Sequence, residues 1–174
     1  MNKMELRNDI KDKIAQLTNE EKERQTELIY RQLTKNKVFQ QASTVLMYWS
    51  LPGEVPTHQF INDWDRRKYI LLPVVKGDDL ELKMYEGEDN MKIGHFGIKE
   101  PIGPTFTDYD RIDLCVVPGV AFDLYKHRMG HGRGFYDKLL ARILALKIGI
   151  AFPQQIVEEL PAEPWDVDMD IVMY

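Results

Sequence analysis

The residues with the clearest chemical potential in this chain lie in the segment RMGHGRGFYDKLL, residues 128–140. Its glycines occupy alternate positions and are Gly130, Gly132 and Gly134. Because glycine loses more backbone freedom on folding than other residues, this alternation indicates unusual dihedral angles or close approach of the backbone to another group. Backbone amides at the start of a helix lack intrahelical partners and attract anions, so phosphate is the expected ligand. Arg128 and Arg133 would donate charge-assisted hydrogen bonds, and His131 would add a further donor.

Two interpretations of this loop stay open from the residues alone. The loop does not match the Walker pattern, which needs Lys-Ser or Lys-Thr after the last glycine, and its glycine spacing departs from the dinucleotide fingerprint. Phosphate binding and a tight connecting turn without a ligand therefore remain equal alternatives.

Further charged or reactive residues occur outside the glycines. Lys3 and Arg7 are four residues apart and share one face of a helix, a spacing that by itself favours a solvated basic face. Asp137 begins the helical pattern after the loop, where an acid in the first turn suits the helix dipole. Cys115 is the only cysteine, so an internal disulfide is excluded. Its apolar run LCVVPG predicts a buried, unreactive thiol.

Periodic apolar residues predict the helices that must position these groups. Leucine and isoleucine recur every three or four residues over 4–17, which is typical of an amphipathic helix. TNEE has the capping-box spacing that would begin a second helix over 18–35. Pro56 fits the first turn of a short helix running through residues 57–67. A further helix is predicted over residues 136–146, directly after the glycine loop.

Strand-like segments alternate with these helices. They cover residues 43–50, 69–75, 79–87, 110–123, 147–152 and 168–174. Pro118 and Gly119 close the buried part of the strand over 110–123. The alternation implies an α/β layered, largely parallel sheet in a single domain over residues 1–174, with ligands at the carboxyl ends of the strands. Residues 86–108 contain glycines and prolines without a period and predict a long excursion with a potential functional role.

Composition and charge exclude several classes of protein. A net charge of −5 disfavours nucleic-acid binding, which normally requires a basic excess. The N-terminus MNKMELRNDIKDKIAQL lacks the apolar core of a signal peptide, and no segment approaches the ~18 apolar residues of a membrane span. We therefore expect a soluble cytoplasmic protein without a nucleic-acid or membrane partner. We also expect a monomer that acts on a small molecule.

Five segments together resemble the signature of the 5-formyltetrahydrofolate cyclo-ligase (5,10-methenyltetrahydrofolate synthetase) family. They are KMELR at residues 3–7, YWSLPGEVPT at 48–57, FGIKEP at 96–101, VPGVAFDLYKHRMGHGRGFYDKLL at 117–140 and EPWDVDMDIVMY at 163–174. They occur in the family order and span nearly the whole chain. The sequence departs from the family pattern at Lys126, where glycine is usual, at Phe135, which replaces the first tyrosine of a pair, and at Lys138, where arginine is common.

The resemblance implies a fold and a reaction. The fold is α/β, a three-layer α/β/α arrangement with a mainly parallel central sheet, Rossmann-like and of the NagB/RpiA/CoA-transferase-like type. The reaction is ATP-dependent ring closure of 5-formyltetrahydrofolate to 5,10-methenyltetrahydrofolate, with ADP and phosphate released. A formamide oxygen is a poor leaving group, so its phosphorylation would precede attack by N10 of the folate. Catalysis would depend on alignment and on neutralising γ-phosphate charge, with Mg²⁺ accompanying ATP.

The resemblance also implies roles for individual residues. The ATP-binding set is Lys3, Arg7, Arg128, Gly130, His131, Gly132, Arg133, Gly134, Phe135 and Tyr136. The folate-binding set is Trp49, Leu51, Glu54 and Tyr136. The Mg²⁺ ligands are Asp137 and Asp166, with Asp168 and Asp170 of the same run as alternatives to the second. The catalytic residues are Arg128, Tyr136 and Asp137.

Alternatives remain beside these roles. Glu54 can equally be a surface acid of a loop, and Trp49 and Leu51 can be core residues at the end of a strand. Two rival functions are a related phosphotransfer enzyme acting on another amide or formyl compound, and a nucleotide-binding module without catalysis. A pterin-compatible pocket around Glu54 would exclude the first, and a complete set of phosphate and metal ligands disfavours the second.

Overall fold

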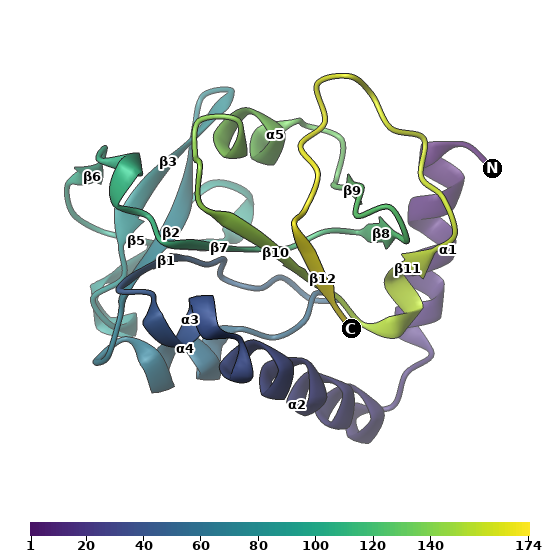
Figure 1. Cartoon of the computed structure of the whole chain (residues 1–174), viewed down its shortest axis with the longest axis horizontal. Coiled ribbons are helices and arrows are strands. Elements are labelled where there is room, and N and C mark those ends of the chain that lie inside the picture. The colour runs from purple at the N-terminus through teal and green to yellow at the C-terminus, as the bar shows by residue number, and fades with distance from the viewer.

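The computed structural model describes residues 1–174 and places seven strands in one central sheet (Figure 1). The strand order is β12-β10-β7-β1-β2-β3-β6. The strands are β1 Thr44–Leu46, β2 Tyr69–Lys76, β3 Asp79–Met84, β6 Thr105–Phe106, β7 Leu114–Val117, β10 Leu146–Ile150 and β12 Ile171–Met173. Strands β2, β1, β7, β10 and β12 are parallel, whereas β2–β3 and β3–β6 are antiparallel. The prediction of a mainly parallel α/β sheet is therefore confirmed.

Five α-helices accompany the sheet. They are α1 Lys3–Ala15, α2 Asn19–Lys35, α3 Lys37–Gln41, α4 His58–Trp64 and α5 Phe135–Leu140. The capping box predicted for the second helix is confirmed, because the side chains of Thr18 and Glu21 each accept the backbone N–H of the other. None of the helices combines the length and the apolar character needed to cross a membrane.

The two faces of the sheet bury different side chains. Successive residues of a strand point to opposite faces, so Val45 joins one apolar core while Leu46 joins the other, and Ile70 and Leu71 divide in the same way. Helices α1 to α4 contribute to the first core and α5 to the second. In Figure 1, α2, α3 and α4 lie on one side of the sheet and α5 lies on the other. Strands covered on both faces explain the nearly continuous apolar runs of the sequence.

Several predicted elements have different boundaries in the structure. Only Thr44–Leu46 of the predicted strand over 43–50 pairs in the sheet, and the residues after it leave the sheet at its carboxyl end. The helix predicted over 136–146 ends at Leu140. The prediction that Pro56 occupies the first turn of a helix is wrong, because α4 begins after Thr57, whose hydroxyl donates to a backbone carbonyl and so fixes the turn.

A small second sheet interrupts the connection between β7 and α5. Its strands are β8 Ala121–Asp123, β9 Arg128–Met129 and β11 Ile156–Val157. The predicted strand over residues 110–123 therefore divides at Pro118 and Gly119 into β7 and β8, because the chain turns there into a β8–β9 hairpin. The glycine loop follows β9 and leads into α5, so it reaches the carboxyl end of the central sheet through this hairpin.

The predicted excursion over 86–108 consists of short elements. They are η1 Glu88–Asn90, β4 Met91–Ile93, η2 His95–Gly97 and β5 Lys99–Pro101, followed by β6; the other 3-10 helices are η3 Tyr109–Arg111 and η4 Pro153–Gln155. Strands β4 and β5 form a hairpin separate from the central sheet. Phe96 at its tip has a φ of 60°, in the left-handed region that non-glycine residues seldom occupy.

Candidate active site

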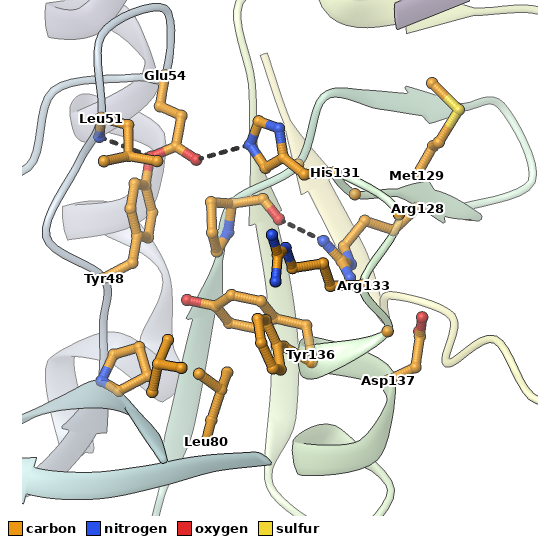
Figure 2. Close-up of a pocket in the computed structure, with 18 of the residues that line it drawn as sticks. Tyr48, Leu51, Glu54, Leu80, Arg128, Met129, His131, Arg133, Tyr136 and Asp137 are labelled. Carbon is orange, nitrogen blue, oxygen red and sulfur yellow. Dashed lines mark hydrogen bonds and ion pairs between the residues drawn. The ribbon is translucent and has the colours of Figure 1, made fainter. Parts of the chain in front are cut away.

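A cavity of about 420 Å³ opens where β1 and β7 end (Figure 2). Such a volume is typical of a small-molecule site, and the position agrees with the expected carboxyl edge of the sheet. Every residue that the sequence analysis assigned to ATP, folate or Mg²⁺ lines this cavity, apart from the two alternative aspartates. These residues are Lys3, Arg7, Trp49, Leu51, Glu54, Arg128, Gly130, His131, Gly132, Arg133, Gly134, Phe135, Tyr136, Asp137 and Asp166.

The glycine loop combines left-handed backbone with close contacts to α1. Gly132 and Gly134 have φ angles of 102° and 69°, which residues with a Cβ rarely adopt. A Cβ on Gly132 would lie 3.3 Å from a terminal nitrogen of Arg7. The Nε of Arg7 donates to the carbonyl oxygen of Gly130 at 2.9 Å, across a separation of 123 residues. The Arg7 side chain of α1 therefore packs against the loop and is only partly exposed.

Arg128 is the buried cation of the cavity wall, with 8% of its surface exposed. Its Nη1 donates to the carbonyl oxygen of Pro118 at 3.0 Å, and its guanidinium lies 5.1 Å from the ring centre of Tyr136. Its buried Nε has no hydrogen-bond partner. Burial lowers the pKa of Arg128, with Asp137 acting in the opposite sense, but a guanidinium remains charged. No carboxylate lies within ion-pairing distance of this guanidinium, and a buried charge without a counter-charge is costly, so the arrangement favours an anionic ligand.

Glu54 lies on the wall facing the glycine loop (Figure 2). Its Oε2 accepts the backbone N–H of Leu51 at 2.9 Å, and its Oε1 lies 3.7 Å from Nε2 of His131. Only 12% of its side chain is exposed, so the alternative of a surface acid does not describe it. Burial raises the pKa of the Tyr136 phenol, and Glu54 acts in the same sense, so this hydroxyl keeps its proton and can donate.

Two aromatic residues, Trp49 and Phe96, line other parts of the cavity. Trp49 stacks on His58 with ring centroids 3.8 Å apart and also packs against the first core, so the cavity and core interpretations both apply to it. The guanidinium of Arg133 lies 4.5 Å from the ring centre of Phe96. This contact joins the glycine loop to the β4–β5 hairpin.

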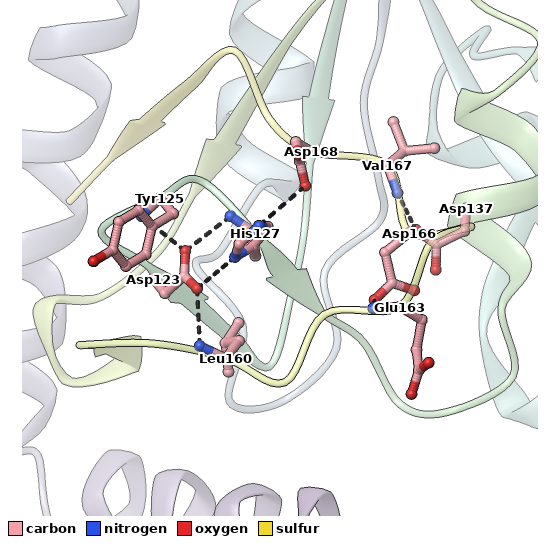
Figure 3. Close-up of polar contacts among 9 residues, drawn as sticks. All are labelled: Asp123, Tyr125, His127, Asp137, Leu160, Glu163, Asp166, Val167 and Asp168. Carbon is pink, nitrogen blue, oxygen red and sulfur yellow. Dashed lines mark hydrogen bonds and ion pairs between the residues drawn. The ribbon is translucent and has the colours of Figure 1, made fainter.

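Asp137 and Asp166 approach each other through the connection between β11 and β12 (Figure 3). One oxygen of Asp137 accepts the backbone N–H of Val167 at 3.0 Å, and one oxygen of Asp166 accepts that of Glu163 at 2.8 Å. Each carboxylate has a second oxygen outside these bonds. The chain contains no group of three or more acidic, histidine or cysteine side chains placed to hold a metal ion. Any ion at this point would therefore need further ligands from a bound substrate and from water.

The two alternative aspartates lie elsewhere. Asp168 Oδ1 is 3.8 Å from Nε2 of His127, and Asp170 Oδ2 accepts the backbone N–H of Lys147 at 2.8 Å beside the β10–β12 pairing. Neither lines the cavity, whereas Asp166 does.

The cavity also contains residues that the sequence analysis did not assign. They are Tyr48, Pro73, Val75, Leu80, Phe96, Ile98, Lys99, Pro118, Gly119, Met129, Pro161 and Trp165. Phe96 and its neighbours belong to the FGIKEP segment, which was a usable signal, and Trp165 adjoins Asp166 in EPWDVD. The apolar strand residues carried no such signal, because a strand residue that lines a cavity has the same sequence pattern as one that packs in a core.

The sequence and the fold both resemble those of known proteins. The model of the 5-formyltetrahydrofolate cyclo-ligase family matches residues 1–174, the whole of the chain. The chain belongs to this family. Among 5-formyltetrahydrofolate cyclo-ligases, a probable member from Caenorhabditis elegans is 30% identical, with 99% of this chain and 92% of the relative covered.

Two solved structures of 5,10-methenyltetrahydrofolate synthetases share the fold. The protein from Aquifex aeolicus is 34% identical with a TM-score of 0.88, and the match covers 99% of this chain and 89% of that one. The protein from Mycoplasma pneumoniae is 26% identical with a TM-score of 0.80, covering 99% of this chain and 98% of that one. The chain thus has 5-formyltetrahydrofolate cyclo-ligase activity, the ATP-dependent conversion of 5-formyltetrahydrofolate to 5,10-methenyltetrahydrofolate. The two rival functions are set aside.

One departure from the 5-formyltetrahydrofolate cyclo-ligase pattern has a structural reason. Lys126 replaces the usual glycine and has a φ of 71°, at the fourth position of the β-turn over residues 123–126 that follows β8. Its backbone N–H donates to the carbonyl oxygen of Asp123 at 3.1 Å. A short hairpin turn of this kind needs a left-handed residue at that position, which glycine supplies without a Cβ penalty. Lys126 adopts the same left-handed conformation, but its Cβ makes that conformation strained.

Proposed function

We propose that the cavity binds ATP and 5-formyltetrahydrofolate together, with the triphosphate along the glycine loop and the pterin against Glu54. The observation that carries this proposal is the buried guanidinium of Arg128, which has no carboxylate partner, in a cavity that is also lined by Glu54. Cations suit the anionic nucleotide, and a carboxylate suits the amide and amino donors of a pterin.

On the nucleotide side, the hydrogen bond from Arg7 to the carbonyl of Gly130 holds the guanidinium in place before a ligand binds. Arginine presents its donors in a planar fork that matches phosphate oxygens, and glycine lets backbone amides approach them closely. The proposed nucleotide-binding residues are Lys3, Arg7, Arg128, Gly130, His131, Gly132, Arg133, Gly134, Phe135 and Tyr136.

On the folate side, the Leu51 N–H occupies one oxygen of Glu54, and the other oxygen, 3.7 Å from Nε2 of His131, would accept from the pterin donors. Tyr136 retains its proton and would donate a hydrogen bond to the folate. Trp49 and Leu51 would form the apolar walls of the pterin pocket.

The carboxylates of Asp137 and Asp166 fit Mg²⁺. In nucleotide sites this ion is held by one or two carboxylates together with phosphate oxygens and waters. Both aspartates line the cavity, and each retains an oxygen outside its backbone bond. When bound, the ion would neutralise charge on the transferring γ-phosphoryl group.

The residues of the chain would act mainly by alignment and charge. Phosphorylation of the formyl oxygen makes it a leaving group, N10 then attacks the same carbon, and phosphate departs as the ring closes. Arg128 is held by the Pro118 carbonyl and the Tyr136 ring, so its charge would need no reorganisation as phosphoryl charge develops. Arg128, Tyr136 and Asp137 are the proposed catalytic residues.

We propose further that residues 1–174 form a single three-layer α/β/α domain, Rossmann-like, and that a monomer suffices for the reaction. Separate apolar cores on the two faces of the sheet support the layers. All residues proposed for the site belong to one chain, which supports activity in the monomer.

Asp137→Asn tests the metal assignment. Asparagine keeps an oxygen to accept the Val167 N–H, so the fold should be retained while the charge is lost. We expect the Mg²⁺ concentration for half-maximal formation of the methenyl chromophore from 5-formyltetrahydrofolate and ATP to rise about tenfold or more, with lower turnover. Exposed Asp110→Asn is the matched control and should change neither. An unchanged Mg²⁺ requirement would return Asp137 to the role of an acid at a helix start.

A further inference from the structure

The connection between β11 and β12, residues 158–170, carries Asp166 with little support of its own. Residues 161–165 are all exposed. Asp166 follows this exposed stretch, and its own hydrogen bonds are local because both join it to the backbone of Glu163. A segment with few buried contacts opens easily, so the position of Asp166 depends on contacts with other elements. Two of these are the 3.8 Å ion pair of Glu163 with Lys3 of α1 and the packing of Val167 against the second core.

The turn of the β8–β9 hairpin holds this connection at both ends (Figure 3). Near its start, the backbone N–H of Leu160 donates to Asp123 Oδ2 at 2.8 Å. Near its end, the backbone N–H of Met169 donates to the carbonyl oxygen of Lys126 at 2.9 Å. Leu160 and Met169 are buried, whereas the stretch between them is mostly exposed.

His127 links the two ends. Its Nδ1 lies 2.8 Å from Asp123 Oδ2, and because an ionised carboxylate only accepts, this nitrogen is the donor. Its Nε2 lies 3.8 Å from Asp168 Oδ1 in the connection. Asp123 is 3% exposed and also accepts the backbone N–H groups of Tyr125 and His127. The imidazole is therefore held in one orientation, facing the connection.

The same hairpin also supplies the residue that follows His127 in the chain, Arg128. One short element thus fixes the buried cation of the nucleotide side and the segment that carries a proposed metal ligand. The connection reaches Asp137 through the single bond from the Val167 N–H. A displaced connection would lose this bond and move Asp166 away from Asp137.

We propose that Asp123 and His127 are positioning residues that hold the connection so that Asp166 stays beside Asp137 in the wall of the cavity. This inference rests on the Mg²⁺ role proposed above for the two aspartates. Neither Asp123 nor His127 lines the cavity, so both would act through the segment they hold and not through contact with a substrate.

Three variants test this role. His127→Ala removes both contacts of the imidazole, whereas His127→Asn retains an N–H donor near the Nδ1 position for Asp123. Leu124→Ala is the control, because this exposed side chain belongs to the same turn and takes no part in the contacts described. The readouts are the Mg²⁺ requirement of methenyl formation, the KM for 5-formyltetrahydrofolate, and hydrogen exchange of residues 158–170 without nucleotide or metal.

For His127→Ala we expect an increase of about tenfold in the half-saturating Mg²⁺ concentration with an unchanged KM for the folate. Hydrogen exchange should become faster in residues 158–170 and not in the rest of the chain. His127→Asn should restore most of the Mg²⁺ affinity and most of the protection from exchange. The positioning role is refuted if His127→Ala leaves Mg²⁺ dependence unchanged, if exchange rises uniformly, or if asparagine restores nothing. Failure of the metal assignment itself is distinguishable, because Asp137→Asn would then leave the Mg²⁺ requirement unchanged while exchange still reports on the connection.

Discussion

Arg7 is assigned to the nucleotide and Glu54 to the folate, so substitutions at the two should affect different ligands. Arg7→Ala removes the guanidinium that bonds the carbonyl of Gly130. Glu54→Gln keeps the shape of the side chain and an oxygen for the Leu51 N–H, but removes the negative charge. The first change should weaken ATP binding and the second should weaken folate binding.

The size of the Arg7 effect follows from its contacts. The Nε is already engaged with Gly130, so the terminal nitrogens remain for phosphate oxygens. Loss of a charge-assisted contact costs about 1.5–3 kcal/mol, which corresponds to roughly ten- to a hundred-fold in Kd. We expect this loss in ATP binding and in turnover, with 5-formyltetrahydrofolate binding measured without ATP little changed. Glu54→Gln should show the reverse pattern, because a neutral oxygen is a weaker acceptor for the pterin donors.

Isothermal titration of each ligand against both variants gives the four affinities that decide this. Arg31→Ala and Glu27→Gln are matched controls, since these residues form an exposed ion pair on α2 outside the cavity. Exposed pairs contribute little, so both controls should bind both ligands normally. If both site substitutions weaken the same ligand, or if neither weakens any, the proposed division of the site is wrong.

Two further predictions concern stability and reactivity. Lys126→Gly should raise the unfolding free energy by about 0.5–1 kcal/mol in a thermal melt, because relief of the left-handed strain exceeds the added freedom of the unfolded chain. Lys126→Ala keeps a Cβ and should not raise it. A glycine variant that is less stable than the original protein would contradict the reasoning. Burial raises the pKa of Cys115 to about 12, so its thiolate is suppressed at all pH values below that range. Iodoacetamide at pH 8 should label this thiol only after unfolding, and rapid labelling of the folded protein would contradict its burial.

Elements that depend on neighbours in the chain could be predicted from the sequence. The Thr18–Glu21 capping box begins a helix as expected, because both partners lie within one turn. Gly132 and Gly134 take the unusual dihedral angles that their alternation indicated. Boundaries were less predictable: the helix after the glycine loop ends at Leu140, and the chain then turns with carbonyls bonded by the ammonium of Lys147. The family signature added what periodicity lacks, the identity of the residues that meet in the cavity.

The environment of each charge was decided only by the tertiary structure. The spacing of Lys3 and Arg7 favoured a solvated face, yet the packing of α1 against the glycine loop brings Arg7 to Gly130 across 123 residues. Arg128 is buried because the β8–β9 hairpin, absent from the sequence prediction, folds it against Pro118. Local patterns set the helices and strands, but burial and pairing depend on which distant segments the sheet order brings together.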